Sequence, residues 1–361
     1  MSERVSVMVT GIGGGGYGEQ IVKALRLART NYRIVGCDMS PFGLGTAEVD
    51  RPYLLPATAD PDYLQCVLAL CKKHKVVALF PGSEPELKIL SRERDRIEKQ
   101  RIFLPINPQP VIDTCMDKFR TAEFLARHGF PAPKTRRIRS ATDAELVDFL
   151  PAVLKPSVGG GGSANVLLAQ TKEELRAFCG HLTTVCEEVI AQEYVGDPDS
   201  EYTVGVLFTM DGELLNSIAV KRFILPSLSN RIKVANSTSQ AALGQVLAIS
   251  NGVSQGEIGS FPDITRPCEE IARRLGCTGT VNLQCRYANG KVYVFEINPR
   301  FSGTTSLRAM VGYNEPDLLV RHHLLGKAVR ARFPFKSGVI MRSLRETLIE
   351  RTDYPKARSL L

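Results

Sequence analysis

The chain of 361 residues lacks a long apolar run, a secretory signal and any Cys-x-x-Cys pair. No apolar run approaches the length of a membrane span. The short run Val5–Val9 near the N-terminus enters glycines, which is not the pattern of a secretory signal. The nine cysteines are scattered without a Cys-x-x-Cys pair, so neither a disulfide framework nor a zinc site is indicated. We therefore expect a cytoplasmic protein with reduced thiols and no membrane partner.

The chain also lacks the motifs of nucleic-acid binding, although its net charge is +8. Basic residues cluster in 134–139 and in 321–358, but no aromatic-interleaved basic motif of a known nucleic-acid-binding type and no zinc finger is recognised. A solvated basic surface is the simpler interpretation, and a basic protein also suits small anionic substrates such as ATP. We expect no nucleic-acid partner.

The first 110 residues alternate between short apolar runs and helix-like segments. The expected strands are Val5–Val9, Arg33–Cys37 and Val76–Phe80, and the expected helices are 18–29 and 63–74. This alternation predicts a parallel, doubly wound α/β sheet. A proline-rich stretch at 104–110 marks a boundary. Residues 1–110 are therefore expected to form an N-terminal Rossmann-like domain.

Residues after 110 show hairpin signals instead. We expect helices at Asp117–His128, at Thr171–Cys179 with a capping box at its start, and at Pro267–Leu275. Strands at 201–209 and 214–220 flank Asp211-Gly212, which predicts a hairpin. These signals indicate an antiparallel α+β fold for the residues after 110. We expect it to divide into a small lobe (111–190), a large lobe (191–330) and a C-terminal extension (331–361) whose charged end is mobile.

The segment Gln284–Arg300 holds polar residues in two strand-like runs that flank Asn289-Gly290. A two-residue loop would pair Ala288 with Lys291 and would mix core and polar residues on each face. A three-residue loop with Gly290 left-handed would instead place Gln284 opposite Glu296. Only this second register separates polar from apolar side chains, and register follows the buried pattern. We therefore predict the three-residue loop.

In that register each face of the hairpin has one character. The polar face would carry Asn282, Gln284, Arg286, Glu296 and Asn298. The apolar face would carry Leu283, Cys285, Tyr287, Tyr293, Phe295 and Ile297. Oxygen donors such as Gln284, Glu296 and Asn298 suit a hard cation such as Mg²⁺. The alternative is a solvated outer face of an ordinary hairpin.

Two glycine-rich loops have the composition of phosphate-binding turns. Gly11–Gly16 fits G-x-G-x-x-G after a strand, and Asp38 follows where a ribose-binding acid would lie, which makes an NAD(P)-dependent oxidoreductase an alternative. Glycines in this place are also needed for tight packing alone. The second loop, 157–163, has no P-loop ending, but it could form a flap over phosphates with Lys155 just before it. A mobile surface hairpin is the alternative for this loop.

Taken together and in order, these motifs resemble the ATP-grasp superfamily, and in particular single-unit relatives of the carbamoyl-phosphate synthetase large subunit. The similarity runs from about Val5 to Gly326. The motifs that carry it are the first glycine turn, Asp117-Lys118, Leu154-Lys155-Pro156 with its glycine loop, Gln192-Glu193-Tyr194-Val195, Glu201, Gln284 and Glu296-Ile-Asn298-Pro-Arg300.

The resemblance implies a role for each matching position. Lys118 and Lys155 would bind nucleotide phosphates, with Lys155 also catalytic, and Gly160, Gly161 and Gly162 would cover the phosphates. Glu193 and Val195 would meet adenine, and Glu201 would bind ribose. Gln284 and Glu296 would contact ATP and, with Asn298, hold Mg²⁺ or Mn²⁺. Arg300 would stabilise the transferring phosphate and the acyl-phosphate.

The implied activity is an ATP-dependent carboxylate–amine ligase that releases ADP and phosphate. Its partners would be a small carboxylic acid and an amine, amino acids among the candidates, and a homodimer would fit the family. The chain departs from the synthetase in having one unit and no glutaminase-like nucleophile motif, and it lacks the further basic residue that the synthetase carries near Gly303. Arg231 and Lys233 would either bind a substrate carboxylate or be surface charges. A non-catalytic ATP sensor is a further alternative.

Overall fold

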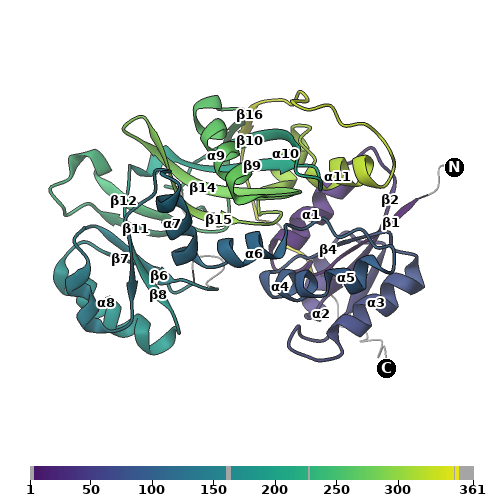
Figure 1. Ribbon diagram of the computed structural model, residues 1–361, viewed down its shortest axis with the longest axis horizontal. Helices are drawn as coiled ribbons and strands as arrows, with labels where there is room; N and C mark the ends of the chain where they lie inside the picture. The colour runs from purple at the N-terminus through teal and green to yellow at the C-terminus, as the bar shows by residue number, and fades with distance from the viewer. Residues whose placement is uncertain (1–3, 160–163, 227, 345, 349–361) are drawn as a thin grey trace.

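The structure is a computed structural model that describes residues 4–159, 164–226, 228–344 and 346–348. Figure 1 shows an N-terminal lobe at lower right, a small lobe around α8 at lower left, and a large sheet across the top that meets both. The three lobes follow one another along the chain. The predicted phosphate-covering glycines Gly160, Gly161 and Gly162 lie outside the described residues.

The N-terminal lobe is the predicted doubly wound α/β sheet. Its elements are β1(Val5–Val9), α1(Tyr17–Arg26), β2(Tyr32–Asp38), α2(Pro41–Thr46), β3(Arg51–Leu54), α3(Tyr63–His74), β4(Ala78–Phe80), α4(Glu84–Arg92) and α5(Arg94–Glu98). The strands run parallel in the order β3-β2-β1-β4. Side chains of β1 alternate between the faces: Val7 packs with Ile21 of α1, whereas Met8 packs with Val67 of α3.

The small lobe follows two linking helices, α6(Gln109–Cys115) and α7(Lys118–Arg127). Its elements are β5(Thr135–Ile138), β6(Ala152–Pro156), β7(Leu167–Ala169), α8(Lys172–Val185) and β8(Val189–Glu193). The strands pair in the antiparallel order β5-β8-β6-β7, and α8 begins with the predicted capping box at Thr171 and Glu174. The predicted division at residue 190 falls inside β8, so this whole strand belongs to the small-lobe sheet.

The large lobe is built on an antiparallel sheet with strand order β15-β14-β9-β10-β13-β16. These strands are β9(Glu201–Phe208), β10(Leu214–Arg222), β13(Gly256–Gly259), β14(Thr280–Ala288), β15(Lys291–Asn298) and β16(Gly338–Ile340). The remaining elements are the hairpin β11(Asn230–Ala235) and β12(Val246–Ser250), and the helices α9(Pro262–Leu275), α10(Thr305–Met310) and α11(Glu315–His323). The α+β prediction is confirmed.

Helix α9 begins five residues before the predicted start at Pro267, because its buried stripe extends upstream of that proline. Ile264, Cys268 and Ile271 share one buried face at helical spacing, and Pro267 lies inside the helix. Packing of this face on the large sheet outweighs the helix-breaking tendency of proline.

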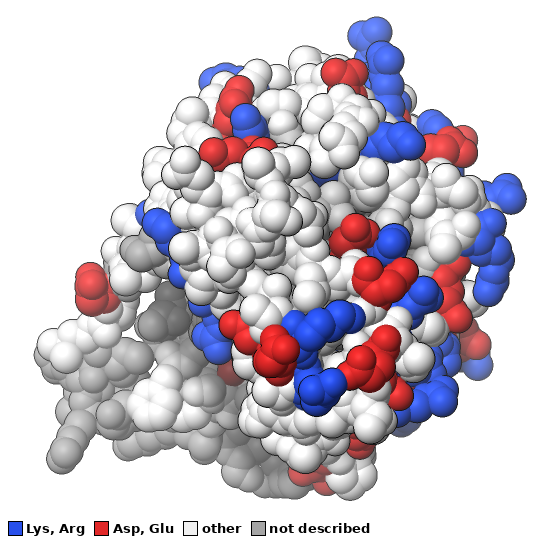
Figure 2. All heavy atoms as spheres, turned by 90° about the vertical axis from the view of Figure 1, so that its left-hand side faces the viewer, with Lys and Arg blue, Asp and Glu red and all other residues white. Residues whose placement is uncertain are grey.

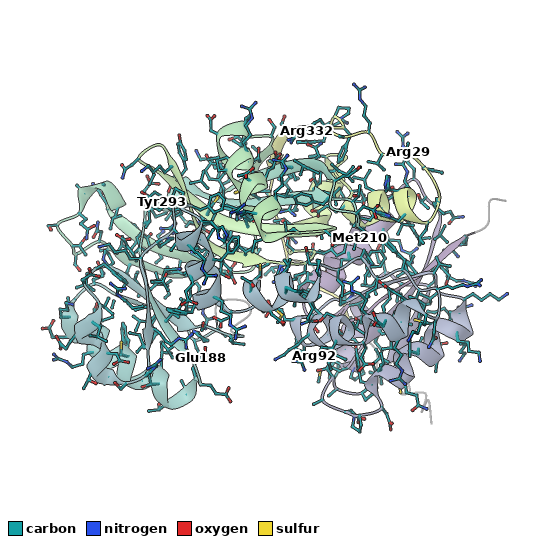
Figure 3. The ribbon with its side chains drawn as sticks, in the orientation of Figure 1. Arg29, Arg92, Glu188, Met210, Tyr293 and Arg332 are labelled. Atoms are coloured by element: carbon teal, nitrogen blue, oxygen red, sulfur yellow. The ribbon has the colours of Figure 1, made fainter. Side chains whose placement is uncertain are left out.

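The C-terminal extension runs back along the large lobe as far as it is described. Arg332, labelled at the top of Figure 3, forms an ion pair with Glu269 of α9, and β16 adds to the sheet beside β13. Arg342 donates to the backbone carbonyls of Ser254 and Gly303. The charged end that we expected to be mobile, 349–361, lies outside the described residues.

Cysteine chemistry matches the sequence analysis. All nine cysteines lie in the described part of the chain, none is in a disulfide, and all except Cys186 are buried. Burial raises the pKa of Cys71 and of Cys277 to about 12, which leaves these thiols protonated at neutral pH. Within the described residues, no helix is long and apolar enough to cross a bilayer.

Candidate nucleotide and metal site

A cleft lies between the small-lobe sheet and the large-lobe sheet, and the N-terminal lobe closes one end of it. Nine of the predicted site residues line this cleft: Lys118, Lys155, Glu193, Val195, Glu201, Gln284, Glu296, Asn298 and Arg300. They come from segments up to about 180 residues apart in the chain. The three predicted glycines of the covering loop lie outside the described residues, and the loop begins beside the cleft at Gly159.

The hairpin at the floor of the cleft has the predicted pairing but not the predicted loop. Ala288 pairs with Lys291, so the loop has two residues, and our three-residue loop is wrong. Asn289 and Gly290 have φ values of 50° and 72°, as a tight Asn-Gly turn requires. A β-bulge between Gln284 and Cys285 then shifts the register. Gln284 therefore still faces Glu296.

The bulge also changes which aromatic side chains face the cleft. Val292 and Val294 pack in the core, where we had placed Tyr293 and Phe295. Tyr293 (labelled in Figure 3) and Phe295 instead line the cleft. The two-residue loop fixes which side chains near it face the core and which face the cleft. The extra residue at the bulge shifts this alternation of side chains by one position farther along the strand. The cleft gains an aromatic surface that suits a flat base.

The predicted metal ligands are brought together on the cleft side of this hairpin. Gln284 is paired with Glu296, and Asn298 follows two residues later on β15. The described residues contain no cluster of three or more His, Cys, Asp or Glu that could hold a metal ion, so the candidate set is one carboxylate and two amides. Mg²⁺ is commonly bound by one or two carboxylates together with substrate phosphates. These three ligands therefore suit Mg²⁺ that is bound together with ATP phosphates better than Mg²⁺ that is held by protein ligands alone.

Lys155 lies on β6, with only 7% of the residue exposed, and faces the hairpin across the cleft. Its Nζ is 3.5 Å from the carbonyl oxygen of Phe295. No carboxylate in the described part of the chain lies within ion-pair distance of it. Burial lowers the pKa of Lys155 to about 8; the charge of Glu296 opposes this shift and the charge of Lys118 adds to it. An anion in the cleft would favour the charged form and raise this pKa again.

Lys118 is the first residue of α7 and contacts the start of the glycine loop. Asp117 caps the helix by accepting from the N–H groups of Phe119 and Arg120. The Lys118 Nζ donates to the carbonyl oxygen of Gly159 at 3.0 Å, and its backbone N–H donates to the carbonyl oxygen of Ser157. The base of the glycine loop is thus held against α7. Lys118 and Lys155 both line the cleft near this loop base and bring two positive charges to it.

Glu193 and Val195 lie where the small-lobe sheet meets the aromatic surface. The Glu193 carboxylate accepts from the N–H of Lys134 at 3.1 Å, so this side chain is held at the strand end. The carbonyl oxygen of Val195 accepts from Arg286. Both residues line the cleft together with Tyr293 and Phe295, and their contact with adenine stays a prediction.

Glu201 is enclosed to a degree that the sequence analysis did not foresee. The residue is 2% exposed, and Arg222 and Arg286 donate to its two carboxylate oxygens at 3.0 to 3.2 Å. Arg286 also lies over the ring of Tyr194. The cluster has one more positive charge than negative and lines a cleft expected to hold a polyanion. Glu201 remains a predicted ribose ligand, and its structural role is to anchor two arginines.

Arg300 connects the cleft to the N-terminal lobe. One of its nitrogens, Nη2, donates to Glu84 at 3.1 Å and to Asn298 at 2.9 Å, and its guanidinium lies over the ring of Tyr17 at 4.3 Å. Tyr17 and Glu84 were not among the predicted site residues. The position of Glu84 in the segment that follows the parallel strand β4 was a usable signal, because ligands bind at the carboxyl edge of such sheets.

The first glycine loop is used for packing. Asp38 accepts from the N–H of Gly13 at 2.7 Å and from that of Ser40 at 2.8 Å, so the expected ribose ligand holds its own loop together. A Cβ on Gly18 would lie 2.2 Å from the carbonyl oxygen of Gly11. These contacts support the packing interpretation of the glycines and do not favour a dinucleotide site.

Arg231 and Lys233 lie on β11 and do not line the cleft, which supports their interpretation as surface charges. On the face drawn in Figure 2, which is the side of the small lobe, acidic and basic side chains are interspersed.

Three family models match the chain in sequence. The PylC-like N-terminal domain matches residues 9–104, the RimK-like ATP-grasp domain matches residues 115–221, and an ATP-grasp family described as belonging to the biosynthetic pathway with Ter operon matches residues 248–347. Together they extend over most of the chain, in the order of its three lobes.

Curated relatives include the carbamoyl phosphate synthase large chains of Thermoplasma volcanium and Thermoplasma acidophilum. Each is 24% identical, over 294 and 299 residues respectively, and each alignment covers 78% of this chain and 26% of the relative. The chain thus spans about a quarter of the length of these relatives.

Solved structures with the same fold include an L-amino acid ligase from Bacillus licheniformis (TM-score 0.62, 16% identity, 89% of this chain and 74% of that chain). An N5-carboxyaminoimidazole ribonucleotide synthetase from Thermus thermophilus has a TM-score of 0.62 at 17% identity, with 92% of this chain and 81% of that chain covered. At these identities the likeness shows the fold.

Proposed function

We propose that this chain, a member of the ATP-grasp superfamily, is an ATP-dependent ligase that joins a small carboxylic acid to an amine through an acyl-phosphate. One observation carries the proposal. Lys155 of the small lobe, Glu296 of the hairpin and Arg300 beside the N-terminal lobe line one cleft. Such a set serves phosphoryl transfer, which depends mostly on positioning and on neutralisation of charge.

The reaction has two displacements. A carboxylate oxygen of the acid attacks the γ-phosphorus of ATP, the bond to the β–γ bridging oxygen breaks, and ADP leaves. The amine nitrogen then attacks the acyl carbon, the bond to the phosphate oxygen breaks, and inorganic phosphate leaves. The nitrogen loses a proton, and an amide remains. Both displacements bring together groups that carry or develop negative charge.

The residues of this chain supply fixed positive charge for both steps. Lys155 and Arg300 reach the cleft from opposite sides, and both are largely buried, so their fields are screened less than in water. Lys118 lies at the base of the covering loop. Gln284, Glu296 and Asn298 would hold Mg²⁺ or Mn²⁺, which when bound neutralises phosphate oxygens.

The candidate substrates are small acids and amines, amino acids among them. A solved structure with this fold is titled as an L-amino acid ligase, and another as a D-alanine–D-alanine ligase. The chain corresponds to about a quarter of the carbamoyl phosphate synthase large chains. We do not propose their whole reaction for it. The predicted homodimer also stays a prediction, which sedimentation velocity would check.

The test is a screen for ADP release from Mg-ATP with amino acids and small carboxylic acids, singly and in pairs, with mass spectrometry for a condensed product. Glu296→Ala and Arg300→Ala should each lower turnover by ~10²–10³ while the melting temperature stays near that of the wild type. Glu270→Ala and Arg273→Ala, an exposed ion pair on α9, are matched controls.

Near-normal turnover in both cleft variants would refute the site. A chain that bound ATP but released no ADP with any acid and amine would be a nucleotide sensor.

A further inference from the structure

Glu84 places a carboxylate at the end of the cleft where the N-terminal lobe meets Arg300. It is the first residue of α4, directly after the turn that follows β4. Its side chain is 27% exposed and lines the cleft. Oε1 accepts from Arg300 at 3.1 Å. Within the described part of the chain, its other oxygen, Oε2, has no hydrogen-bond donor.

A second glutamate on the same helix shows what a purely structural carboxylate looks like here. Glu86 is 6% exposed, and both its oxygens are used: Tyr63 donates to one, and Ser83 and the N–H of Gly82 donate to the other. Glu84 differs because it lines the cleft and its Oε2 accepts no hydrogen bond from the described residues. This difference points to a ligand and not to packing.

The remaining carboxylates of the cleft have other surroundings. Among the described residues that line it, the acidic side chains are Glu84, Glu193, Glu201 and Glu296. Glu193 is held at the adenine end, Glu201 is enclosed by two arginines, and Glu296 faces Gln284 in the candidate metal set. Glu84 is thus the acidic group left at the reacting end, beside Arg300.

We infer that Glu84 binds the ammonium form of the amine substrate, which passes one proton to solvent before its nitrogen attacks, an assignment that rests on the proposed ligase function. Most amines arrive at neutral pH as cations, and a carboxylate is the group that recognises an ammonium best. The neighbouring Arg300 would repel a cation in the empty cleft. Once the acyl-phosphate is present, its negative charge offsets that repulsion, so the amine should bind after phosphoryl transfer.

Glu84→Gln tests the inference because it removes the charge but keeps an oxygen that can accept from Arg300. We expect the KM for the amine to rise roughly 10- to 100-fold, the range for losing a hydrogen bond to a charged group. Formation of a hydroxamate from hydroxylamine, a nucleophile that is uncharged at neutral pH, should stay within about threefold of the wild type. Glu93→Gln, at a partly exposed glutamate directly after the C-terminal end of α4, is the matched control.

The outcomes separate the inference from the proposed function. No hydroxamate and no ADP from the wild type would refute the ligase itself. Hydroxamate formation by the wild type, with an unchanged amine KM in Glu84→Gln, would overturn only the role of Glu84. Equal losses with amine and hydroxylamine would show that Glu84 merely positions Arg300, which would also overturn it.

A second variant keeps the test decisive if Glu84→Gln does not fold. Glu84→Asp keeps the charge on a shorter side chain. We expect a rise in the KM for the amine of less than about tenfold, with unchanged hydroxamate formation. A rise above that range, or a loss of hydroxamate, would contradict the inference.

Discussion

Raising the pH from 7 to 9 should weaken ATP binding about tenfold, because Lys155 loses its proton over this range. Burial holds the pKa of this side chain at about 8 in the protein without nucleotide, and Lys118 adds to the shift against the opposing charge of Glu296. Phosphates in the cleft favour the charged form and raise that pKa. Binding above pH 8 therefore requires uptake of a proton, and affinity falls as the pH rises.

The magnitude follows from the fraction of Lys155 that is charged. About 90% is charged at pH 7 and about 10% at pH 9 for a pKa near 8, which is about a tenfold change in the dissociation constant, or ~1.4 kcal/mol. Isothermal titration calorimetry with a non-hydrolysable Mg-ATP analogue at pH 7, 8 and 9 measures it. Repeating the titration in buffers of different ionisation enthalpy measures the proton uptake directly.

Lys155→Arg is the control, because a guanidinium stays charged at pH 9. Its dissociation constant should change little between pH 7 and pH 9, even if its affinity is lower than that of the wild type. A flat wild-type profile would refute the reasoning. An equal slope in wild type and variant would assign the pH dependence to another group.

Two further predictions concern stability. Lys155→Met should abolish ATP turnover yet stabilise the nucleotide-free protein at pH 7 by ~1–3 kcal/mol. The cost of burying the charged lysine is fully present below its folded pKa of about 8 and disappears as the pH approaches its unfolded value of 10.5. Urea unfolding measures this free energy, and a destabilised variant would contradict the burial cost. Gly205→Ala should destabilise the protein by ~1–3 kcal/mol in the same assay, because the added Cβ would lie 2.4 Å from the guanidinium carbon of the buried Arg308. The control Gly338→Ala, which has no atom within 4 Å of its Cβ, should change the stability little.

The hairpin shows why the sequence predicted the pairing of the site residues better than it predicted the backbone path of the hairpin. The polar pattern correctly demanded that Gln284 face Glu296, and the Asn-Gly pair correctly signalled a two-residue loop. We treated these as exclusive, because strict alternation along a strand allows only one of them. The structure satisfies both with a bulge, which leaves no signature in the order of apolar and polar residues.

The parts of the site that the sequence missed depend on contacts between distant segments. Tyr17 and Glu84 reach Arg300 from the N-terminal lobe, and Arg222 reaches Glu201 from the neighbouring strand. None carries a local pattern that marks it as functional. Lys155 was predicted as a point charge, but its lowered pKa follows only from its burial in the folded chain.

Transfer of oxygen from the acid to phosphate tests the acyl-phosphate most directly. The acid found in the ADP-release screen would be labelled with ¹⁸O in both carboxylate oxygens, and the inorganic phosphate would be examined by mass spectrometry after turnover with Mg-ATP and the amine. The account predicts one ¹⁸O in each phosphate released and one left in each amide formed. Unlabelled phosphate, or label in AMP, would contradict it.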